Sequence, residues 1–137
     1  MSDAPNPWET EEYARLAGFG GTWRDTWYHD DFLALMAHRW RLREANRLLD
    51  LGCGAGHWGQ RLAHFLPDGA QVVGTDIDPG FAEQAQNRAQ ELGLKNYTGI
   101  AAPAEKLPFD DNSFDVVTCQ TVLIHVADVP AALQEAL

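Results

Sequence analysis

The sequence predicts an α/β fold with an open parallel sheet at its centre. Short apolar runs at 47–51, 71–75 and 114–119, with a weaker one at 97–101, have the length and composition of strands. Nearly continuous apolar strands are typical of parallel sheets, which are buried on both faces. Helical stretches separate most of these runs, so the connections are expected to cross over from one strand to the next parallel one.

The N-terminal region, residues 1–44, is predicted to be a polar tail followed by helices. In its second helix the apolar residues recur with helical spacing and predict one apolar face: Phe32, Leu35, Met36 and Trp40. Asp30 or Asp31 is expected to cap the start of that helix. Glycines at 18, 20 and 21 separate it from an earlier helical piece at 9–17.

The later helices have clear ends. Residues 56–66 form one predicted helix. Residues 79–92 form another, which begins with Pro79 and ends before Gly93, the usual asymmetry of helix termini. This second helix is expected to present a stripe of apolar residues: Phe81, Ala85, Ala89 and Leu92. Asp128 is expected to cap the last helix.

Composition and charge exclude several classes of protein. The 137 residues include ten basic and twenty acidic ones, for a formal net charge of −10. Such a chain lacks the positive surface that non-specific nucleic-acid or anionic-membrane binding needs. It has no run of 18 apolar residues, and no signal peptide is expected. Cys53 and Cys119 are expected to be free thiols in a reducing cytoplasm, and no residue spacing indicates a metal site.

A glycine-rich segment, residues 50–56, lies between the first predicted strand and the helix after it. Glycines let the backbone approach a ligand closely, and the start of a helix offers free N–H groups. In open α/β sheets, ligands bind beyond the carboxyl ends of the strands. The segment therefore predicts a ligand site, and the alternative is a tight strand-to-helix turn.

The spacing of the glycines and of the next carboxylate narrows the class of ligand. The dinucleotide fingerprint Gly-x-Gly-x-x-Gly would place its third glycine where His57 stands, and this chain has Gly56 instead. Asp76 ends the next predicted strand, 26 residues after Asp50. A carboxylate at that place can accept hydrogen bonds from both hydroxyls of a ribose. Asp78 is the better helix cap, which leaves Asp76 free for a ligand.

Three segments in this order resemble successive motifs of class I S-adenosylmethionine-dependent methyltransferases. They are residues 48–56, residues 73–79, and residues 104–109 continued by 113–117. The resemblance is greatest to the small-molecule branch that includes the ubiquinone/menaquinone-biosynthesis type, and it covers residues 46–137. It implies a Rossmann-like domain at 45–137, S-adenosylmethionine as cofactor, a small-molecule methyl acceptor and a cytoplasmic location. Neither nucleic acid nor a membrane is an expected partner.

The resemblance also implies a cofactor site. The loop would lie against the methionine and ribose parts of the cofactor with these residues: Asp50, Gly52, Cys53, Gly54 and Gly56. Asp76 would bind the ribose hydroxyls, and Ile77 would pack on the adenine. The Ala104 N–H would meet an adenine ring nitrogen, with Glu105 beside it. The Gln120 carbonyl would accept a hydrogen bond from the methionine amino group.

This chain departs from the family pattern before Ala104. Such proteins commonly have an aspartate there that accepts from the adenine amine, and Pro103 has no carboxylate. Either Glu105 substitutes for that aspartate, or water or backbone meets the amine.

The segment after the fourth predicted strand bears on the class of methyl acceptor. Nucleic-acid amino-methyltransferases usually have an Asp/Asn-Pro-Pro-aromatic run where this chain reads Gln-Thr-Val-Leu at 120–123, which disfavours a nucleic-acid acceptor.

Methyl transfer is an in-line displacement at a sulfonium methyl, so it depends mainly on positioning and desolvation. A base is needed only where the acceptor must lose a proton. His125, just after the fourth strand, is the candidate base or substrate contact, and a structural histidine is the alternative. His57 is a candidate neighbour of the cofactor. Aromatic N-terminal residues form either a lid over the site or a cap that buries only its own stripe: Tyr13, Phe19, Trp23, Trp27 and Tyr28.

Two further interpretations stay open. One is a nicotinamide-dependent oxidoreductase with a Rossmann domain, and the other is a cofactor-binding module or fragment without turnover. The sheet order of the family is 3-2-1-4-5-7-6, and this sequence reads as truncated after the fourth strand. We therefore expect an uncovered sheet edge at 114–119, and poor stability of residues 1–137 expressed alone.

Overall fold

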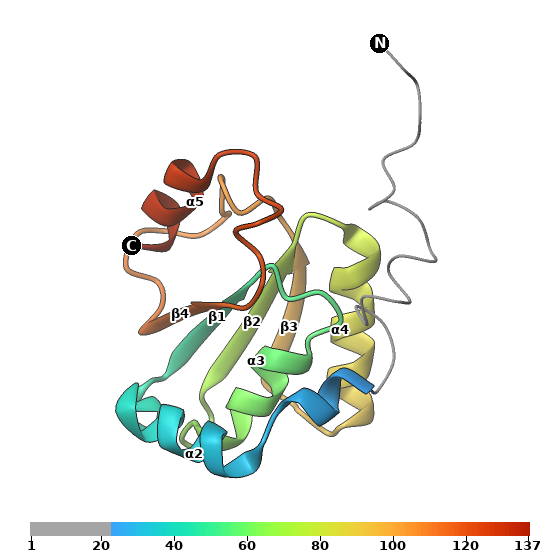
Figure 1. The fold of residues 1–137 in the computed structure, drawn as a ribbon, viewed down its shortest axis with the longest axis vertical. Coiled ribbons are helices and arrows are strands. Elements are labelled where there is room, and N and C mark those ends of the chain that lie inside the picture. Colours follow the sequence, from blue (N-terminus) through green and yellow to red (C-terminus); the bar gives the residue numbers. More distant parts are fainter. Residues whose placement is uncertain (1–22) are drawn as a thin grey trace.

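The computed structural model describes residues 23–137, and its centre is a four-stranded parallel sheet (Figure 1). The strands, in chain order, are β1 (Arg47–Leu51), β2 (Gln71–Asp76), β3 (Tyr97–Ala101) and β4 (Val116–Cys119). Their spatial order is β3-β2-β1-β4, and each neighbouring pair is parallel. The predicted α/β fold with a parallel sheet is confirmed, and the glycine-rich loop leaves the sheet from its inner strand β1.

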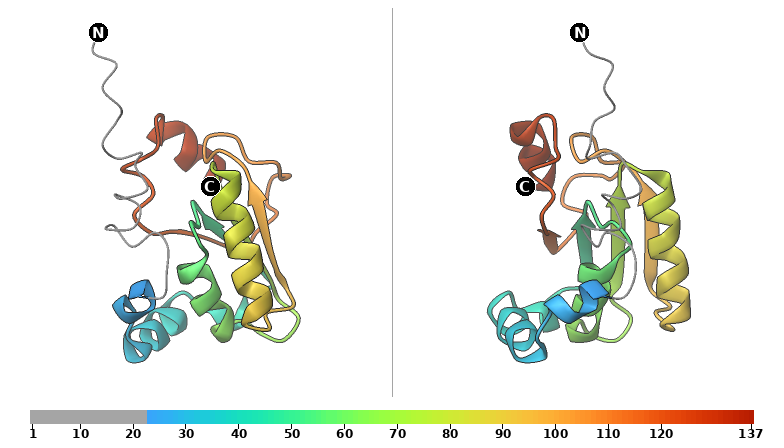
Figure 2. Two further views of the ribbon diagram at one scale, coloured as in Figure 1. Left: turned by 90° about the vertical axis from the view of Figure 1, so that its right-hand side faces the viewer. Right: turned by 45° about the vertical axis from the view of Figure 1, so that its right-hand side comes forward.

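The helices are α2 (Asp30–Arg39), α3 (His57–Leu62), α4 (Pro79–Glu91) and α5 (Val129–Ala136). Short 3-10 turns are η2 (Trp23–Trp27), η3 (Leu42–Glu44) and η4 (Ala63–Phe65). Helix α3 packs against β1 and β2, and α4 packs against β2 and β3. The two helices lie side by side (Figure 2) and are joined by a hydrogen bond from Gln60 Nε2 to the Ala85 carbonyl, 2.7 Å long. No helix of the described part is long and apolar enough to cross a membrane.

The hydrophobic core joins the N-terminal helices to the sheet. Tyr28, Leu33 and Leu42 are buried in the same cluster as Leu48 of β1 and Leu62 of α3. The predicted boundary between residues 1–44 and 45–137 stays a prediction. The described part of the first segment shares its core with the second.

Helix α2 buries a different face from the one its periodicity predicts. Leu33 and Ala37 are 1% and 5% exposed, whereas Phe32 and Leu35 are 53% and 52% exposed. The predicted face and the observed buried face are neighbours on the helix surface. Which of them is buried depends on the orientation in which α2 packs on the core. The expected cap is also wrong: the N-cap residue is His29, with no capping side-chain bond, and both aspartates lie in the first turn. The predicted helical piece at 9–17 lies outside the described residues.

Helix α4 begins as predicted, because the Asp78 carboxylate accepts a hydrogen bond from the Gly80 N–H at 2.8 Å. Its buried line is made of alanines at 82, 85 and 89, while Leu92 is 52% exposed. The predicted stripe is therefore partly wrong. Small side chains bring α4 close to β3, so close that a Cβ on Gly99 would meet the Ala82 carbonyl oxygen. The predicted helix at 56–66 divides into α3 and η4.

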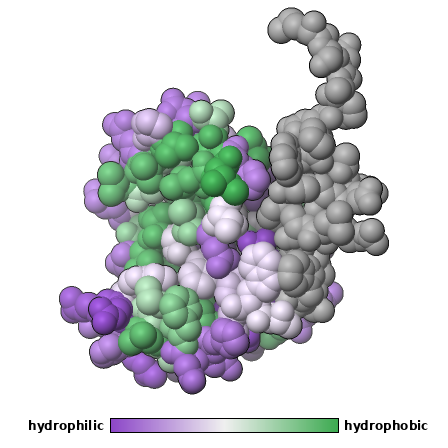
Figure 3. All heavy atoms as spheres, viewed as in Figure 1, coloured by the Kyte–Doolittle hydropathy of each residue, from purple (hydrophilic) through white to green (hydrophobic). Residues whose placement is uncertain are grey.

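Strand β4 forms one edge of the described sheet and pairs only with β1. A groove of about 500 Å³ runs along it, lined by Trp40 and residues 115–119. Helix α5 is capped as predicted, since Asp128 Oδ1 accepts from the Ala131 N–H at 3.0 Å. Apolar residues gather over α5 and the segment before it (Figure 3). We expected this strand to form an uncovered edge of the sheet. In the described part of the chain, β4 has no strand on its other side.

Candidate functional site

The glycine-rich loop connects β1 to α3 at the carboxyl ends of the strands. Gly52, Gly54 and Gly56 have φ values of 65°, 53° and 87°, a left-handed conformation that favours glycine. No atom of residues 23–137 lies within 4 Å of the position that a Cβ of Gly54 would take, so these residues leave the loop surface open there. A Cβ on Gly52 would instead lie 2.6 Å from the Val122 side chain. The loop therefore packs against the segment after β4, and its middle, at the half-buried Gly54, is not covered by the described residues.

Asp76, at the end of β2, holds this loop in place. Its Oδ2 accepts a hydrogen bond from the Gly54 N–H at 2.9 Å, and its Oδ1 accepts from the Asp78 N–H at 3.0 Å. Asp78 caps α4 as predicted, and Asp76 has a loop-holding role that was not expected; its role toward a ligand stays a prediction. A carboxylate has about four acceptor sites, so two remain for ligand hydroxyls. Ile77, the next residue, is 74% exposed and offers an apolar surface beside the carboxylate.

Asp50 lies beneath the loop, near the carboxyl end of β1, and is 2% exposed. Burial raises the pKa of its carboxyl to about 7, and the charge of Asp76 adds to this effect. Its Oδ2 accepts a hydrogen bond from the Gly59 N–H of α3 at 3.0 Å. Gly59 lies in no motif of the sequence and was not among the predicted site residues. A Cβ at this residue would lie 2.6 Å from Asp50 Oδ2, so only glycine lets α3 approach the carboxylate this closely.

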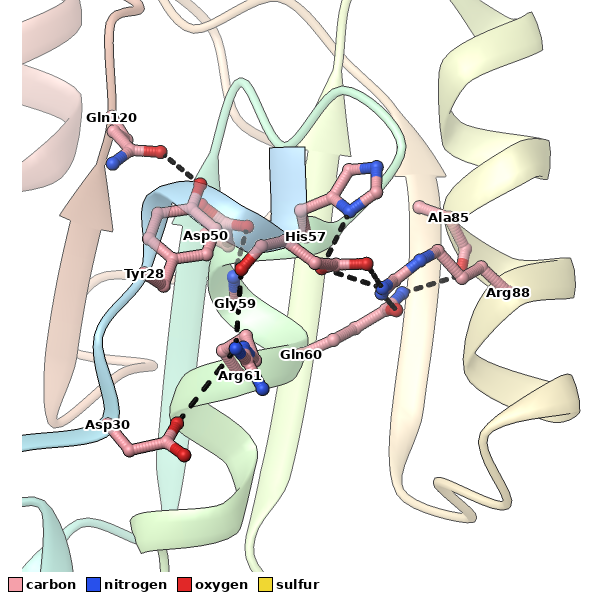
Figure 4. Close-up of polar contacts among 11 residues, drawn as sticks. Tyr28, Asp30, Asp50, His57, Gly59, Gln60, Arg61, Ala85, Arg88 and Gln120 are labelled. Carbon is pink, nitrogen blue, oxygen red and sulfur yellow. Dashed lines mark hydrogen bonds and ion pairs between the residues drawn. The ribbon is translucent and has the colours of Figure 1, made fainter. Parts of the chain in front are cut away.

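A segment from the N-terminal region crosses the site. We call residues 23–29 the strap. The Tyr28 hydroxyl donates to Gln120 Oε1 (Figure 4), and Arg24 Nη2 donates to Thr121 Oγ1 at 3.1 Å. The partners are 92 and 97 residues apart in sequence. No local sequence pattern marks these contacts, and Arg24 was not among the predicted site residues.

Asp25 anchors the strap to α3 and α4. Both its carboxylate oxygens accept from Arg88 Nη2, at 2.9 and 2.8 Å, and Oδ1 also lies 3.0 Å from His57 Nδ1. Burial by itself would raise the pKa of Asp25, but the His57 hydrogen bond and the Arg88 charge outweigh it and lower that pKa. Desolvation lowers the pKa of His57, against the opposing effect of Asp25. His57 is thus part of the strap anchor, and Figure 4 shows its imidazole between the loop and α4.

Replacing Asp25 by Asn is expected to loosen the strap. The substitution removes the charge that Arg88 binds through both oxygens, at a cost of about 1–2 kcal/mol in the free energy of unfolding. Hydrogen exchange at the backbone amides of 24–28 should become faster at pH 7. Asp31→Asn, an exposed residue of α2, is the control. Equal exchange in wild type and Asp25→Asn would remove Asp25 from the anchor.

The remaining predicted cofactor residues lie after β3 and β4. Ala104 and Glu105 are half-buried in the turn after β3, and Glu105 Oε1 accepts from the Asp128 N–H at 3.4 Å. The Gln120 carbonyl accepts from the Thr121 hydroxyl at 2.7 Å and keeps a second lone pair. Their roles toward a cofactor stay predictions.

Cys53 and His125 complete the predicted set. Cys53 is buried without a disulfide, and burial raises the pKa of its thiol. His125 is exposed in the turn after β4, where its backbone N–H donates to the Val122 carbonyl at 2.9 Å. Within residues 23–137 no group of three His, Cys, Asp or Glu side chains is placed to hold a metal ion. The roles of both residues, like the absence of a metal, stay predictions.

Comparison with known protein families shows which family the chain belongs to. A family model described as a methyltransferase domain matches residues 42–137, which include all four strands and the glycine-rich loop. The chain belongs to the methyltransferase-domain family. The predicted resemblance is therefore confirmed, and membership in this family favours the methyltransferase interpretation over the nicotinamide-dependent one.

Three relatives illustrate the family. The "Uncharacterized methyltransferase YcgJ" of Bacillus subtilis is 40% identical over 103 residues, which are 75% of this chain and 40% of that protein. Its crystal structure superposes with a TM-score of 0.69 at 36% identity, over 78% of this chain and 44% of the other. The "Ubiquinone/menaquinone biosynthesis C-methyltransferase UbiE" of Coxiella burnetii is 35% identical over 115 residues, with 77% of this chain and 46% of that protein covered.

The third relative has a different named activity. The structure of the [4+2]-cyclase SpnF gives a TM-score of 0.66 at 31% identity, over 77% of this chain and 39% of the other. The chain thus spans about half the length, or less, of the relatives it matches.

Proposed function

We propose that this chain binds S-adenosylmethionine at the carboxyl ends of β1, β2 and β4 and serves the transfer of its methyl group to a small molecule. The observation that carries the proposal is the joint placement of Gly54 and Asp76. An open loop surface lies beside a carboxylate that has acceptor sites to spare. The two hydroxyls of a ribose fit the remaining acceptor sites of this carboxylate.

The other predicted residues fit the remaining parts of the cofactor. The exposed Ile77 side chain offers an apolar face to the adenine, with Ala104 and Glu105 on the turn after the neighbouring strand. Asp50 and the Gln120 carbonyl face the amino-acid end. When bound, S-adenosylmethionine supplies a sulfonium methyl. The strap contributes by excluding water from this end, because desolvation and positioning dominate such a displacement.

The proposed acceptor is a small molecule. UbiE and the "2-phytyl-1,4-naphtoquinone methyltransferase" of Nostoc are named for quinone substrates, and the net charge of −10 disfavours nucleic acid. We propose His125 as the base or acceptor contact, since it is exposed on the turn after β4. Two free thiols are compatible with a cytoplasmic location, which remains part of the proposal.

A second candidate function is a cofactor-bound scaffold without methyl transfer. The named activity of SpnF, a cyclase on a related fold, favours keeping this alternative. It differs from the main proposal in one measurable way. Both alternatives require binding of S-adenosylmethionine, and only the first consumes it in the presence of an acceptor.

The proposal is tested by calorimetric binding of S-adenosylhomocysteine. Asp76→Ala removes the acceptor for two hydroxyls and releases the Gly54 N–H. At ~1–3 kcal/mol for leaving such partners unmet, affinity should fall roughly 5- to 150-fold. Asp68→Ala, an exposed carboxylate between α3 and β2, is the charge-matched control. An unchanged dissociation constant would remove Asp76 from the site. A wild-type protein that does not bind the ligand at all would overturn the proposed function.

A further inference from the structure

The outward face of helix α2 presents large apolar side chains that residues 23–137 do not cover. Phe32 and Leu35 are 53% and 52% exposed, whereas Leu33 and Ala37 on the opposite face are buried. Because an α-helix turns by about 100° per residue, Leu35 lies at the centre of the outward face. Figure 1 shows α2 at the edge of the fold, away from the end of the sheet that carries the glycine-rich loop. A partner on this face would leave the proposed cofactor site open.

Two opposite charges flank this apolar centre. Asp31 lies four residues before Leu35 and Arg39 four residues after it, and both are exposed. The two charged residues are about 12 Å apart along the helix axis, so they cannot pair with each other. Within residues 23–137 neither side chain has an ion-pair partner. The outward face therefore has an acidic end, an apolar middle and a basic end, and the described part of the chain compensates neither charge.

This order of side chains is complementary to its own reverse. If two copies of α2 pack antiparallel with a two-fold axis at Leu35, each residue faces the one equally far beyond the axis in the other copy. Asp31 then faces Arg39 of the partner subunit, and Phe32 faces His38 of the partner subunit. A two-fold interface requires such self-complementarity. A parallel arrangement would place like charges opposite each other, which is unfavourable.

We propose that α2 is the contact of a homodimer, in which two copies of this chain pack their outward faces antiparallel across a two-fold axis at Leu35. A helix of ten residues is about 15 Å long, so the contact is small and the dimer dissociates readily. The expected dissociation constant is roughly 10 µM to 1 mM. At low micromolar concentration the chain is monomeric, and Asp31→Asn then remains a neutral control for exchange in the strap.

An anionic membrane is the other partner that exposed apolar and basic side chains could suit. Asp31 lies on the outward face, and Asp30 beside it is 87% exposed. Both carboxylates would be repelled by anionic lipid headgroups. In the antiparallel dimer, by contrast, Asp31 contributes an attractive pair at each end of the contact. The charges on this face therefore favour a second copy of the chain.

The test uses charge reversals at the two ends of the outward face. Asp31→Arg places two arginines opposite each other at both ends of the contact, and Arg39→Asp does the same with two aspartates. Sedimentation equilibrium of the whole chain should show that each variant alone dimerises roughly 5- to 50-fold more weakly than the wild type. An equimolar mixture of the two variants should recover the wild-type affinity, because every reversed charge then faces an opposite one. This combination is expected only where position 31 of one copy meets position 39 of the other.

A second variant leaves both ends of the helix unchanged. Leu35→Glu places two carboxylates at the two-fold axis and should abolish the dimer at all concentrations up to about 1 mM. Because charge reversal at a helix end opposes the helix dipole, urea unfolding is used to confirm that each variant is folded. The matched controls, Glu83→Arg and Lys95→Asp, reverse exposed charges elsewhere. They should leave the dissociation constant within about twofold of the wild-type value.

Three results would overturn the inference. The first is a wild-type chain that stays monomeric up to about 1 mM. The second is a mixture of Asp31→Arg and Arg39→Asp that dimerises no better than its separate components. The third is a monomer that binds phosphatidylglycerol vesicles and loses this binding in Leu35→Glu, which would assign the face to a membrane. None of these measurements includes the cofactor, so they are independent of the proposed function.

Discussion

The free energy of unfolding of the wild-type protein is expected to fall, relative to that of Asp50→Asn, as the pH rises from about 4 to about 7. Burial raises the pKa of the Asp50 carboxyl in the folded protein to about 7. Its stabilising contribution is therefore fully present below the ordinary pKa near 4 and is lost as the pH rises through the folded-state value. At about 1.4 kcal/mol for each pH unit, the difference is on the order of 4 kcal/mol.

Urea unfolding at a series of pH values measures this effect. Asparagine keeps an oxygen that accepts from Gly59, and the cost of its amide group is the same at every pH, so the difference between the two proteins isolates the carboxyl. Asp30→Asn changes a side chain that is 87% exposed and should run parallel to the wild type. Parallel curves for wild type and Asp50→Asn would mean that the carboxyl titrates normally.

Gly59→Ala is expected to lower the free energy of unfolding by about 3 kcal/mol, the upper part of the range for an overpacked core. The added Cβ would lie 2.6 Å from Asp50 Oδ2 and 2.8 Å from Asp50 Cβ. Both residues belong to buried elements, so the strain is relieved only by separating α3 from β1. That movement breaks the bond between Asp50 and the Gly59 N–H and displaces the glycine-rich loop.

Thermal or urea unfolding gives the stability of this variant, and binding of S-adenosylhomocysteine should weaken along with it. The matched control is Gly80→Ala, another helical glycine. Among the described residues, its Cβ would come within 4 Å only of the Asp78 side chain, whose Oδ1 would lie 3.1 Å away. That side chain is exposed and can shift by a few tenths of an ångström. Because alanine favours helix, that control should be as stable as the wild type or slightly more stable. A Gly59→Ala protein of wild-type stability would contradict the close approach described for α3 and β1.

Much of the sheet was predictable from local sequence. The runs at β1, β2 and β3 became strands within a residue of their predicted bounds. A strand that is buried on both faces needs a nearly continuous run of apolar residues, and each of these runs has that composition. The Asp78 and Asp128 caps were also predictable, because a cap joins residues only two or three positions apart. The glycine-rich loop was recognisable for the same reason: its left-handed backbone requires glycine whatever surrounds it.

The sequence by itself determined the order of strands and helices along the chain, the position of the glycine-rich loop and the membership in the methyltransferase-domain family. Each of these depends on neighbouring residues or on a contiguous motif. Only the tertiary structure decided which face of α2 is buried and that Asp76 holds the loop. It also decided that Arg24 and Tyr28 reach Thr121 and Gln120. These contacts join segments distant in sequence. They form because packing the strap on α3 and α4 brings the partners together, and periodicity carries no information about such an approach.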